Sequence, residues 1–224
     1  MQTGTDNLEA MEEARRYNAY LLSLARRAGE GLVLDFGAGH GTFARAMADD
    51  RRSVVCVEPD AAARGRLQAL GLEVHPDLAT APQRQFDGIY SFNVLEHIED
   101  DEAALRALYD RLRPGGRIVI YVPAFPVLFS AMDRLVGHHR RYVRGPLSET
   151  MGRVGFRIGE ARYVDSLGFF AALVFRFTGG GDGRLSPRSV ALYDRMVFPA
   201  SRALDALAGR WFGKNLLIEA CKPA

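Results

Sequence analysis

A short glycine-rich segment carries the residue types best suited to binding a nucleoside-like ligand. Residues 32–34 form an apolar run that predicts a buried strand, and Asp35 closes it. Three glycines follow at alternate positions: Gly37, Gly39 and Gly41. They permit a tight turn with an exposed backbone, and an apolar period starting at Phe43 predicts a helix that points its N–H groups at a ligand. The carboxylate of Asp35 disfavours a pyrophosphate and favours a ligand with an ammonium group.

Two further residues separate this segment from a dinucleotide-binding turn. Position 42, where the dinucleotide fingerprint requires Gly or Ala, is Thr42. Glu58 ends the next predicted strand, 21 residues after Gly37, where a carboxylate can accept hydrogen bonds from both hydroxyls of a ribose. The pattern indicates a nucleoside that bears an amino acid. The pattern disfavours a nicotinamide oxidoreductase, which remains an alternative for the whole protein. For Glu58 alone, the alternative is a solvent-exposed residue at the end of a strand.

Composition and charge restrict the class of protein. With 224 residues, 48% of them hydrophobic and 25% charged, the chain is expected to form a single domain over 1–224. The net charge of +2 argues against nucleic acid as a partner. Two cysteines, Cys56 and Cys221, imply no disulfide framework, and the acidic N-terminus does not read as a signal peptide. We therefore expect a cytoplasmic protein.

Strand and helix signals alternate along the first half of the chain. Strands are predicted at 32–36, 53–58, 72–75, 87–92 and 117–122, and helices at 41–49, 60–69 and 101–112. An N-terminal cap helix is predicted within 1–29, and Asp100 and Asp101 are expected at the N-cap of the helix from 101. This alternation predicts a parallel sheet with helices on both faces.

The pattern changes after Pro123. A loop is followed by a helix near 146–153, a strand near 156–163 and a last strand at 215–221. Residues 164–212 are expected to form a helical insertion that acts as a lid, broken by glycines 179–181 and by Pro187. Its apolar stretch Leu167–Phe177 is much shorter than the ~20 residues of a membrane helix, so a buried or interfacial helix is expected.

These segments resemble the S-adenosylmethionine-binding motifs of class I methyltransferases. The resemblance rests on Asp35 with the glycine turn, on Glu58, on Asp77-Leu78 and on the segments 86–98 and 113–118. It implies an α/β fold with a Rossmann-like, doubly wound, seven-stranded and mostly parallel sheet, and a helical cap inserted before the last strand. It implies S-adenosyl-L-methionine as cofactor, with contacts from Tyr17, Asp35, Gly37, Gly39, Glu58, Pro59, Asp77, Leu78 and Asn93. A turn-forming role for Asp77 and a core role for Tyr17 are the alternatives.

The rest of the chain resembles a narrower group of bacterial methyltransferases, often encoded near glycosyltransferases. The group shares a proline loop, an Asp and a Gly-His-x-Arg-Arg-Tyr segment, which here are Pro123, Asp133 and 137–142. A Tyr-Asn pair in the first helix, here Tyr17-Asn18, also matches. The Gly-x-Ser-like turn before the last strand is Gly-Lys-Asn here, which is a departure. The group does not fix a substrate.

Histidines and arginines near these motifs are the candidates for chemistry on the acceptor. His97, His138 and His139 are candidate catalytic bases, because imidazole titrates near neutral pH. Arg140, Arg141 and Tyr142 are candidate substrate-binding residues. The alternatives are a structural histidine at 97 and a loop held by pairing of the arginines with Asp133 or Glu149. No metal-ligand cluster at convincing spacing is recognised.

The expected function is methyl transfer from S-adenosylmethionine to a small-molecule or lipid-linked acceptor, most readily at oxygen. The aromatic residues of 164–212 leave a peripheral membrane contact open. A non-catalytic, cofactor-binding regulatory or docking subunit is the alternative from a different class.

Overall fold

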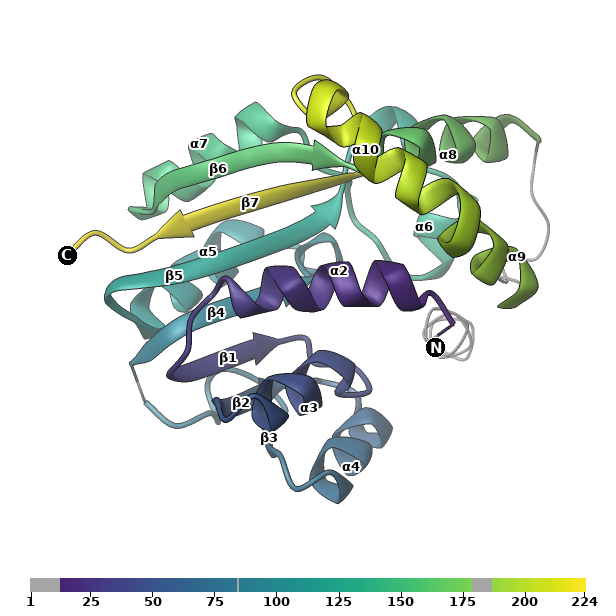
Figure 1. The fold of residues 1–224 in the computed structure, drawn as a ribbon. Coiled ribbons are helices and arrows are strands. Elements are labelled where there is room, and N and C mark those ends of the chain that lie inside the picture. Colours follow the sequence, from purple (N-terminus) through teal and green to yellow (C-terminus); the bar gives the residue numbers. More distant parts are fainter. Residues whose placement is uncertain (1–12, 84, 179–186) are drawn as a thin grey trace.

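The computed structural model describes residues 13–83, 85–178 and 187–224. Within these residues one sheet forms, with strand order β3-β2-β1-β4-β5-β7-β6 (Figure 1). The strands are β1 (Leu32–Phe36), β2 (Ser53–Val57), β3 (Glu73–His75), β4 (Phe86–Phe92), β5 (Leu112–Pro123), β6 (Arg157–Val164) and β7 (Asn215–Cys221). Only β7 among these seven runs antiparallel to its neighbours. The predicted seven-stranded, mostly parallel sheet is confirmed.

Helices cover both faces of the sheet because successive side chains of each strand point to opposite sides. One face packs against α2 (Arg15–Arg26), α3 (Thr42–Asp49) and α4 (Ala61–Ala69), and the other against α5 (Asp101–Arg111) and α7 (Arg144–Val154). On β1, Val33 belongs to the core beneath α2 and Leu34 to the core beneath α5. Burial on both faces explains the unbroken apolar run of this strand.

Most predicted elements agree with the structure within a few residues. The last strand lies at 215–221 as predicted, and Asp100 caps α5 by accepting a 2.9 Å hydrogen bond from the Ala103 N–H. β5 starts five residues before the predicted 117, because Leu112 pairs with Phe86 before a bulge at the Pro-Gly-Gly turn. Helix α6 (Ala131–Leu135) was not predicted, since five residues are too few to show a period.

The insertion before β7 is helical, as predicted. It consists of α8 (Ser166–Thr178), α9 (Pro187–Leu192), the π-helix η3 (Tyr193–Val197) and α10 (Phe198–Ala208). We call these four elements the cap. The predicted break at glycines 179–181 lies outside the described residues, and Pro187 begins α9. None of the described helices combines the length and apolar character that crossing a membrane requires.

Buried carboxylates anchor the cap to the rest of the protein. Asp205 on α10 accepts hydrogen bonds from the Asp165 N–H, the Ser166 N–H and the Ser166 hydroxyl at the start of α8. Asp194 on η3 accepts hydrogen bonds from the Arg16 and Tyr17 N–H groups at 2.9 and 2.8 Å. Both side chains therefore satisfy backbone donors at a helix N-terminus that would otherwise lack partners.

Replacing Asp205 by Ala is expected to lower the free energy of unfolding by about 3 kcal/mol. The reason is that two buried N–H groups and one hydroxyl lose their acceptor. Urea unfolding followed by circular dichroism measures the change. Asp110→Ala, which truncates an exposed carboxylate on α5, is the control and should stay within about 0.5 kcal/mol of the parent protein. Equal effects of the two substitutions would contradict the anchoring role.

Candidate active site

The glycine turn joins β1 to α3 and presses against the loop that follows β4. The Gly37 N–H donates a 2.8 Å hydrogen bond to the Val57 carbonyl, which ties the turn to the end of β2. Gly37 has a φ of +86°, and a Cβ there would lie 2.2 Å from a methyl carbon of Val94. A Cβ at Gly39 would meet nothing within 4 Å. The turn is therefore closed at Gly37 and open at Gly39, where a ligand can approach the backbone.

Asp35 is buried at the carboxyl end of β1, directly before the turn. Its Oδ2 accepts a 2.9 Å hydrogen bond from the Tyr90 hydroxyl. Burial, reinforced by the nearby carboxylate of Glu58, raises the pKa of Asp35 to about 7. No cationic side chain among the described residues forms an ion pair with Asp35 or Glu58. The site thus holds a buried carboxyl group without a protein counter-ion, and a cationic ligand group would favour its charged form.

Glu58 is fixed at the end of β2. Its Oε2 accepts a 2.8 Å hydrogen bond from the Gly39 N–H, and its Oε1 accepts one of 2.9 Å from the Asp60 N–H. The side chain is buried rather than solvated. Each carboxylate oxygen keeps a lone pair for a ligand hydroxyl. Pro59, between Glu58 and the N-cap Asp60, follows the strand at the same edge of the sheet.

These features fit S-adenosylmethionine. An open glycine gives access to the backbone, a buried unpaired carboxylate can receive an ammonium group, and a second carboxylate is oriented for ribose hydroxyls. A pyrophosphate would lie against two carboxylates, so the structure does not suit a dinucleotide.

The predicted adenine-contacting pair follows β3 at the same edge. Asp77 is exposed and makes a local turn, since its Oδ1 accepts hydrogen bonds from the Thr80 N–H and hydroxyl. These bonds lower the pKa of Asp77. Leu78 is half-buried against the core. The turn-forming alternative for Asp77 is therefore present in the structure, and a contact with adenine stays a proposal.

Tyr17 on α2 and Asn93 after β4 lie close together near the carboxyl edge of the sheet. The Tyr17 ring packs edge-on against Tyr121 and Phe198, with centroids 6.2 and 5.4 Å away. Burial raises the pKa of the Tyr17 hydroxyl, which faces the side chains of Tyr121 and Asn93. Asn93 follows β4 with a φ of +56°, an uncommon backbone conformation that occurs often at functional sites. Tyr17 therefore combines the core role with a position near Asn93.

Two of the three predicted histidines lie together beyond the end of β4. His97 ends the 3₁₀ turn η1 (Leu95–His97), and its ring lies edge-on to His138 with centroids 4.6 Å apart. Burial, together with His138, lowers the pKa of His97, which favours the neutral imidazole. His139 is exposed, and its N–H donates a 2.7 Å hydrogen bond to the Glu96 carbonyl.

Asp133 holds His138 and Arg141 in place. Its Oδ1 lies 2.8 Å from His138 Nδ1, and Arg141 donates to Oδ1 and Oδ2 at 2.8 and 3.0 Å. The Ser130 N–H and hydroxyl also donate to Asp133. Burial by itself would raise the pKa of Asp133, but the hydrogen bonds from His138 and Arg141 outweigh it and keep this pKa well below its usual range. Arg141 thus adopts the pairing that the sequence left open as an alternative to substrate binding.

The other two predicted substrate-binding residues contact Asp101 on α5. Arg140 forms a 3.0 Å ion pair with Asp101 and donates to the Glu99 carbonyl. The buried Tyr142 donates a 2.9 Å hydrogen bond to the same carboxylate. The three predicted residues therefore lie near the histidines but do not converge on one point.

Sequence reasoning missed Glu96, which lies inside the apolar segment between Val94 and Ile98. The side chain has no exposed surface, and both carboxylate oxygens lack a hydrogen-bond partner among the described residues. Burial raises the pKa of Glu96 to about 8. The sequence did contain a signal for Glu96, because a carboxylate in a largely apolar loop between a strand and a helix is a candidate buried acid.

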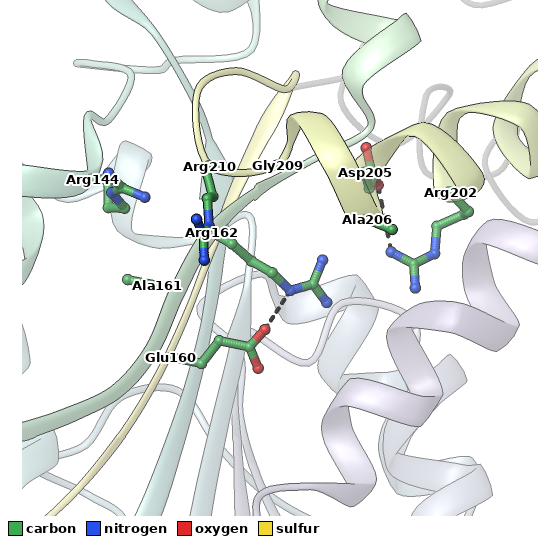
Figure 2. Close-up of a pocket in the computed structure, with 9 residues that line it drawn as sticks. All are labelled: Arg144, Glu160, Ala161, Arg162, Arg202, Asp205, Ala206, Gly209 and Arg210. Atoms are coloured by element: carbon green, nitrogen blue, oxygen red, sulfur yellow. Dashed lines mark hydrogen bonds and ion pairs between the residues drawn. The ribbon is translucent and has the colours of Figure 1, made fainter.

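A separate groove of about 470 Å³ lies along β6 and α10 (Figure 2). It is lined by Arg144, Glu160, Ala161, Arg162, Arg202, Asp205, Ala206, Gly209 and Arg210. Its two carboxylates are paired, Glu160 with Arg162 at 2.5 Å and Asp205 with Arg202 at 3.4 Å. None of the predicted site residues lines this groove, so we do not place the cofactor there.

Comparisons with known proteins identify the family of the chain. The model of a family described as "Methyltransferase domain" matches residues 9–160. A Mycolicibacterium smegmatis protein named "Probable S-adenosylmethionine-dependent methyltransferase" is 28% identical over 163 residues, 70% of this chain and 62% of the relative. An Alkalilimnicola ehrlichii protein named "Ubiquinone biosynthesis O-methyltransferase" is 31% identical over 97 residues, 39% of each chain. The chain thus spans less than two thirds of the length of these curated relatives.

The solved structures that resemble this fold include an S-adenosylmethionine-dependent methyltransferase from Mesorhizobium loti. The TM-score is 0.60 at 20% identity, and the match covers 91% of this chain and 96% of the other. At this identity the likeness supports the fold.

Proposed function

Because the chain belongs to the methyltransferase-domain family, whose cofactor is S-adenosylmethionine, we propose that it methylates a small-molecule or lipid-linked acceptor, at oxygen. The observation that carries the proposal is the buried carboxylate of Asp35, which lacks a cationic partner among the described residues and lies between the glycine turn and Glu58. When bound, the cofactor supplies an electrophilic methyl group on a sulfonium sulfur.

In this proposal, different residues bind different parts of the cofactor. Asp35 receives the ammonium group of the methionyl part, and Gly39 admits close approach to the backbone. Glu58 receives the ribose hydroxyls, and Asp77 with Leu78 flanks the adenine. Tyr17 and Asn93 border the same space. Such positioning accounts for much of the rate enhancement in a displacement reaction, since it aligns the reacting atoms before the bond changes occur.

The acceptor is proposed to lie between the histidine cluster and the cap. His97 and His138 are each candidates to accept the proton of an acceptor hydroxyl. The new bond then joins oxygen to the methyl carbon while the carbon–sulfur bond breaks, and the electron pair returns to sulfur. Phe125, at the end of β5, packs on Tyr163 and Phe169 with centroids 4.5 and 5.4 Å away, which favours an acceptor with an apolar part.

A lipid-linked acceptor is supported by apolar side chains exposed on the cap. They are Phe170, Val174, Leu192, Met196 and Leu207, and the exposed Trp211 follows three residues after the end of α10. Co-sedimentation with phospholipid vesicles tests this part of the proposal, with a Trp211→Ser and Leu207→Ser double variant as the comparison. Absence of vesicle binding by the parent protein would favour a water-soluble acceptor.

Methyl transfer itself is tested with the purified chain alone. Labelled S-adenosylmethionine and fractionated bacterial metabolites and lipids are expected to give a labelled product, and the carbon-13 shift of the transferred methyl identifies oxygen as the acceptor atom. Binding of S-adenosylhomocysteine without any labelled product would instead support the non-catalytic regulatory subunit. Failure to bind S-adenosylhomocysteine would contradict both.

The affinity for S-adenosylhomocysteine is expected to fall about tenfold per pH unit below pH 7. Free Asp35 holds its proton up to about pH 7, and pairing with the ligand ammonium requires the charged carboxylate. The same raised pKa makes Asp35 disfavour folding as the pH rises from about 4 to 7, since the unfolded chain gives up this proton at a lower pH. Calorimetry between pH 5 and 7.5 measures the slope, and an Asp35→Asn variant should show none.

A further inference from the structure

Glu96 is the one carboxylate among the described residues whose two oxygens are both buried without a hydrogen-bond partner. Leaving such a group unsatisfied in the protein interior costs free energy, and an ionised carboxylate costs more than a neutral one. The nearest charged groups do not relieve this. Arg141 is occupied by Asp133, and His138 Nε2 lies 3.9 Å from Glu96 Oε1, which is beyond hydrogen-bonding distance. The arrangement therefore lacks a group that would bind these oxygens.

Two imidazoles face the same space. One nitrogen from each of His97 and His138 and one oxygen of Glu96 all lie within 4.8 Å of one another. His97 and Glu96 come from η1, directly after β4, and His138 comes from the loop between α6 and α7. Three ligand atoms from two separate segments thus converge on one point beyond the carboxyl end of the sheet.

Asp133 fixes the orientation of the His138 ring through the nitrogen that does not face Glu96. Its Nδ1 lies 2.8 Å from Asp133 Oδ1, and Asp133 is itself held by Arg141 and Ser130. This contact places the proton on Nδ1 and leaves the Nε2 lone pair toward Glu96. A carboxylate that fixes the tautomer and ring of a histidine in this way is the usual second partner of a metal-bound imidazole.

We propose that Glu96, His97 and His138 bind one divalent transition-metal ion of the Zn²⁺ type, with at least one coordination position open. Two histidines and one glutamate match the ligand set of catalytic zinc sites, which keep a position for water or substrate. Zinc–ligand bonds of about 2.0–2.2 Å require the three ligand atoms to move closer together by roughly 1 Å. The ion would satisfy both the charge and the lone pairs of Glu96.

The part of this ion in methyl transfer rests on the proposed function, whereas its binding does not. An ion with an open position lowers the pKa of a bound hydroxyl and so favours loss of the acceptor proton to solvent. The deprotonated oxygen is then the nucleophile for the displacement described above. In that case His97 and His138 would act as metal ligands, and the buried Glu96 would be the third ligand.

The full chain, stripped of metal with a chelator and exchanged into metal-free buffer, provides the test. Calorimetric titration with Zn²⁺ is expected to show one ion per chain. Glu96→Gln and His138→Gln are each expected to weaken binding by about 100-fold or more, because each removes a ligand. Glu96→Gln is isosteric and puts a neutral group in the same buried space, so this variant should stay folded, as circular dichroism can verify.

A matched control removes an imidazole elsewhere. His75 Nε2 lies 3.2 Å from Glu73 Oε1 on β3, and His75→Gln should leave the stoichiometry and affinity unchanged. Co²⁺ in place of Zn²⁺ gives a second readout, since its visible spectrum reports coordination by nitrogen and oxygen in the folded protein. The spectrum should be absent in Glu96→Gln.

The proposal is overturned if the parent protein takes up no ion, or if Glu96→Gln binds Zn²⁺ as tightly as the parent. Loss of binding in His75→Gln alone would also overturn it, because the ion would then lie at β3. S-adenosylhomocysteine affinity measured on the same preparations separates the two hypotheses. Cofactor binding without metal contradicts only the ion, and metal binding without the cofactor contradicts only the proposed function.

Discussion

Asp35→Asn is expected to reduce the affinity for S-adenosylhomocysteine by at least about 100-fold while the protein stays folded. Loss of one partner from a buried ion pair costs about 3–5 kcal/mol, and each 1.4 kcal/mol is a factor of ten. The amide fits the same space and can still pair with the Tyr90 hydroxyl. Because burial already disfavours the charged form of Asp35, the neutral variant should unfold at the same temperature as the parent or higher.

Isothermal titration with S-adenosylhomocysteine measures the loss of affinity, and circular dichroism confirms the fold. Asp49→Asn is the matched control, since it removes an exposed carboxylate of α3 that forms an ion pair with Arg45. Its affinity should equal that of the parent. If folded Asp35→Asn bound the ligand normally, the ammonium group would have to be received elsewhere.

Gly37→Ala is expected mainly to lower the stability of the protein, and Gly39→Ala is expected mainly to lower its affinity for the cofactor. At Gly37 the positive φ costs about 1–2 kcal/mol and the overlap with Val94 adds to it, so a total loss of stability of about 3 kcal/mol is expected. At Gly39 the new methyl meets no protein atom, so only the cost of the φ remains. In the proposed binding mode that methyl would meet the cofactor, and the affinity should fall at least about tenfold.

Thermal unfolding and titration with S-adenosylhomocysteine, performed on both variants, distinguish the two effects. Adding Val94→Ala to Gly37→Ala should return the part of the stability lost to overlap and leave the part due to φ. Unchanged affinity in folded Gly39→Ala would show that the cofactor does not pass over the open side of the turn.

The segment from β1 to α3 could be predicted from the sequence because each of its features is local. An apolar run buried on both faces, three glycines and a helical period lie within a few residues, and the structure has positive φ at all three glycines. Asp35 and Glu58 could be placed at one edge for the same reason, since parallel strands end together. The parallel sheet with helices on both faces followed from the alternation of elements.

The histidine cluster could be anticipated only in part, because it depends on contacts between distant segments. His97 and His138 were candidates by residue type, but their proximity depends on the path of the loop after β5. The pairing of Arg141 with Asp133 competes with any role in binding an acceptor, and spacing alone does not decide between them. Glu96 was missed because a carboxylate in a short apolar segment resembles a surface residue until its burial is known.

The hydrogen bonds that Asp194 accepts from the first turn of α2 link movement of η3 to movement of that helix. Any displacement of η3 that uncovers the acceptor side also breaks the bonds to the N–H groups of Arg16 and Tyr17. The first turn of α2, which carries Tyr17, would then loosen in the same step. We expect opening of η3 and loosening of the start of α2 to occur together.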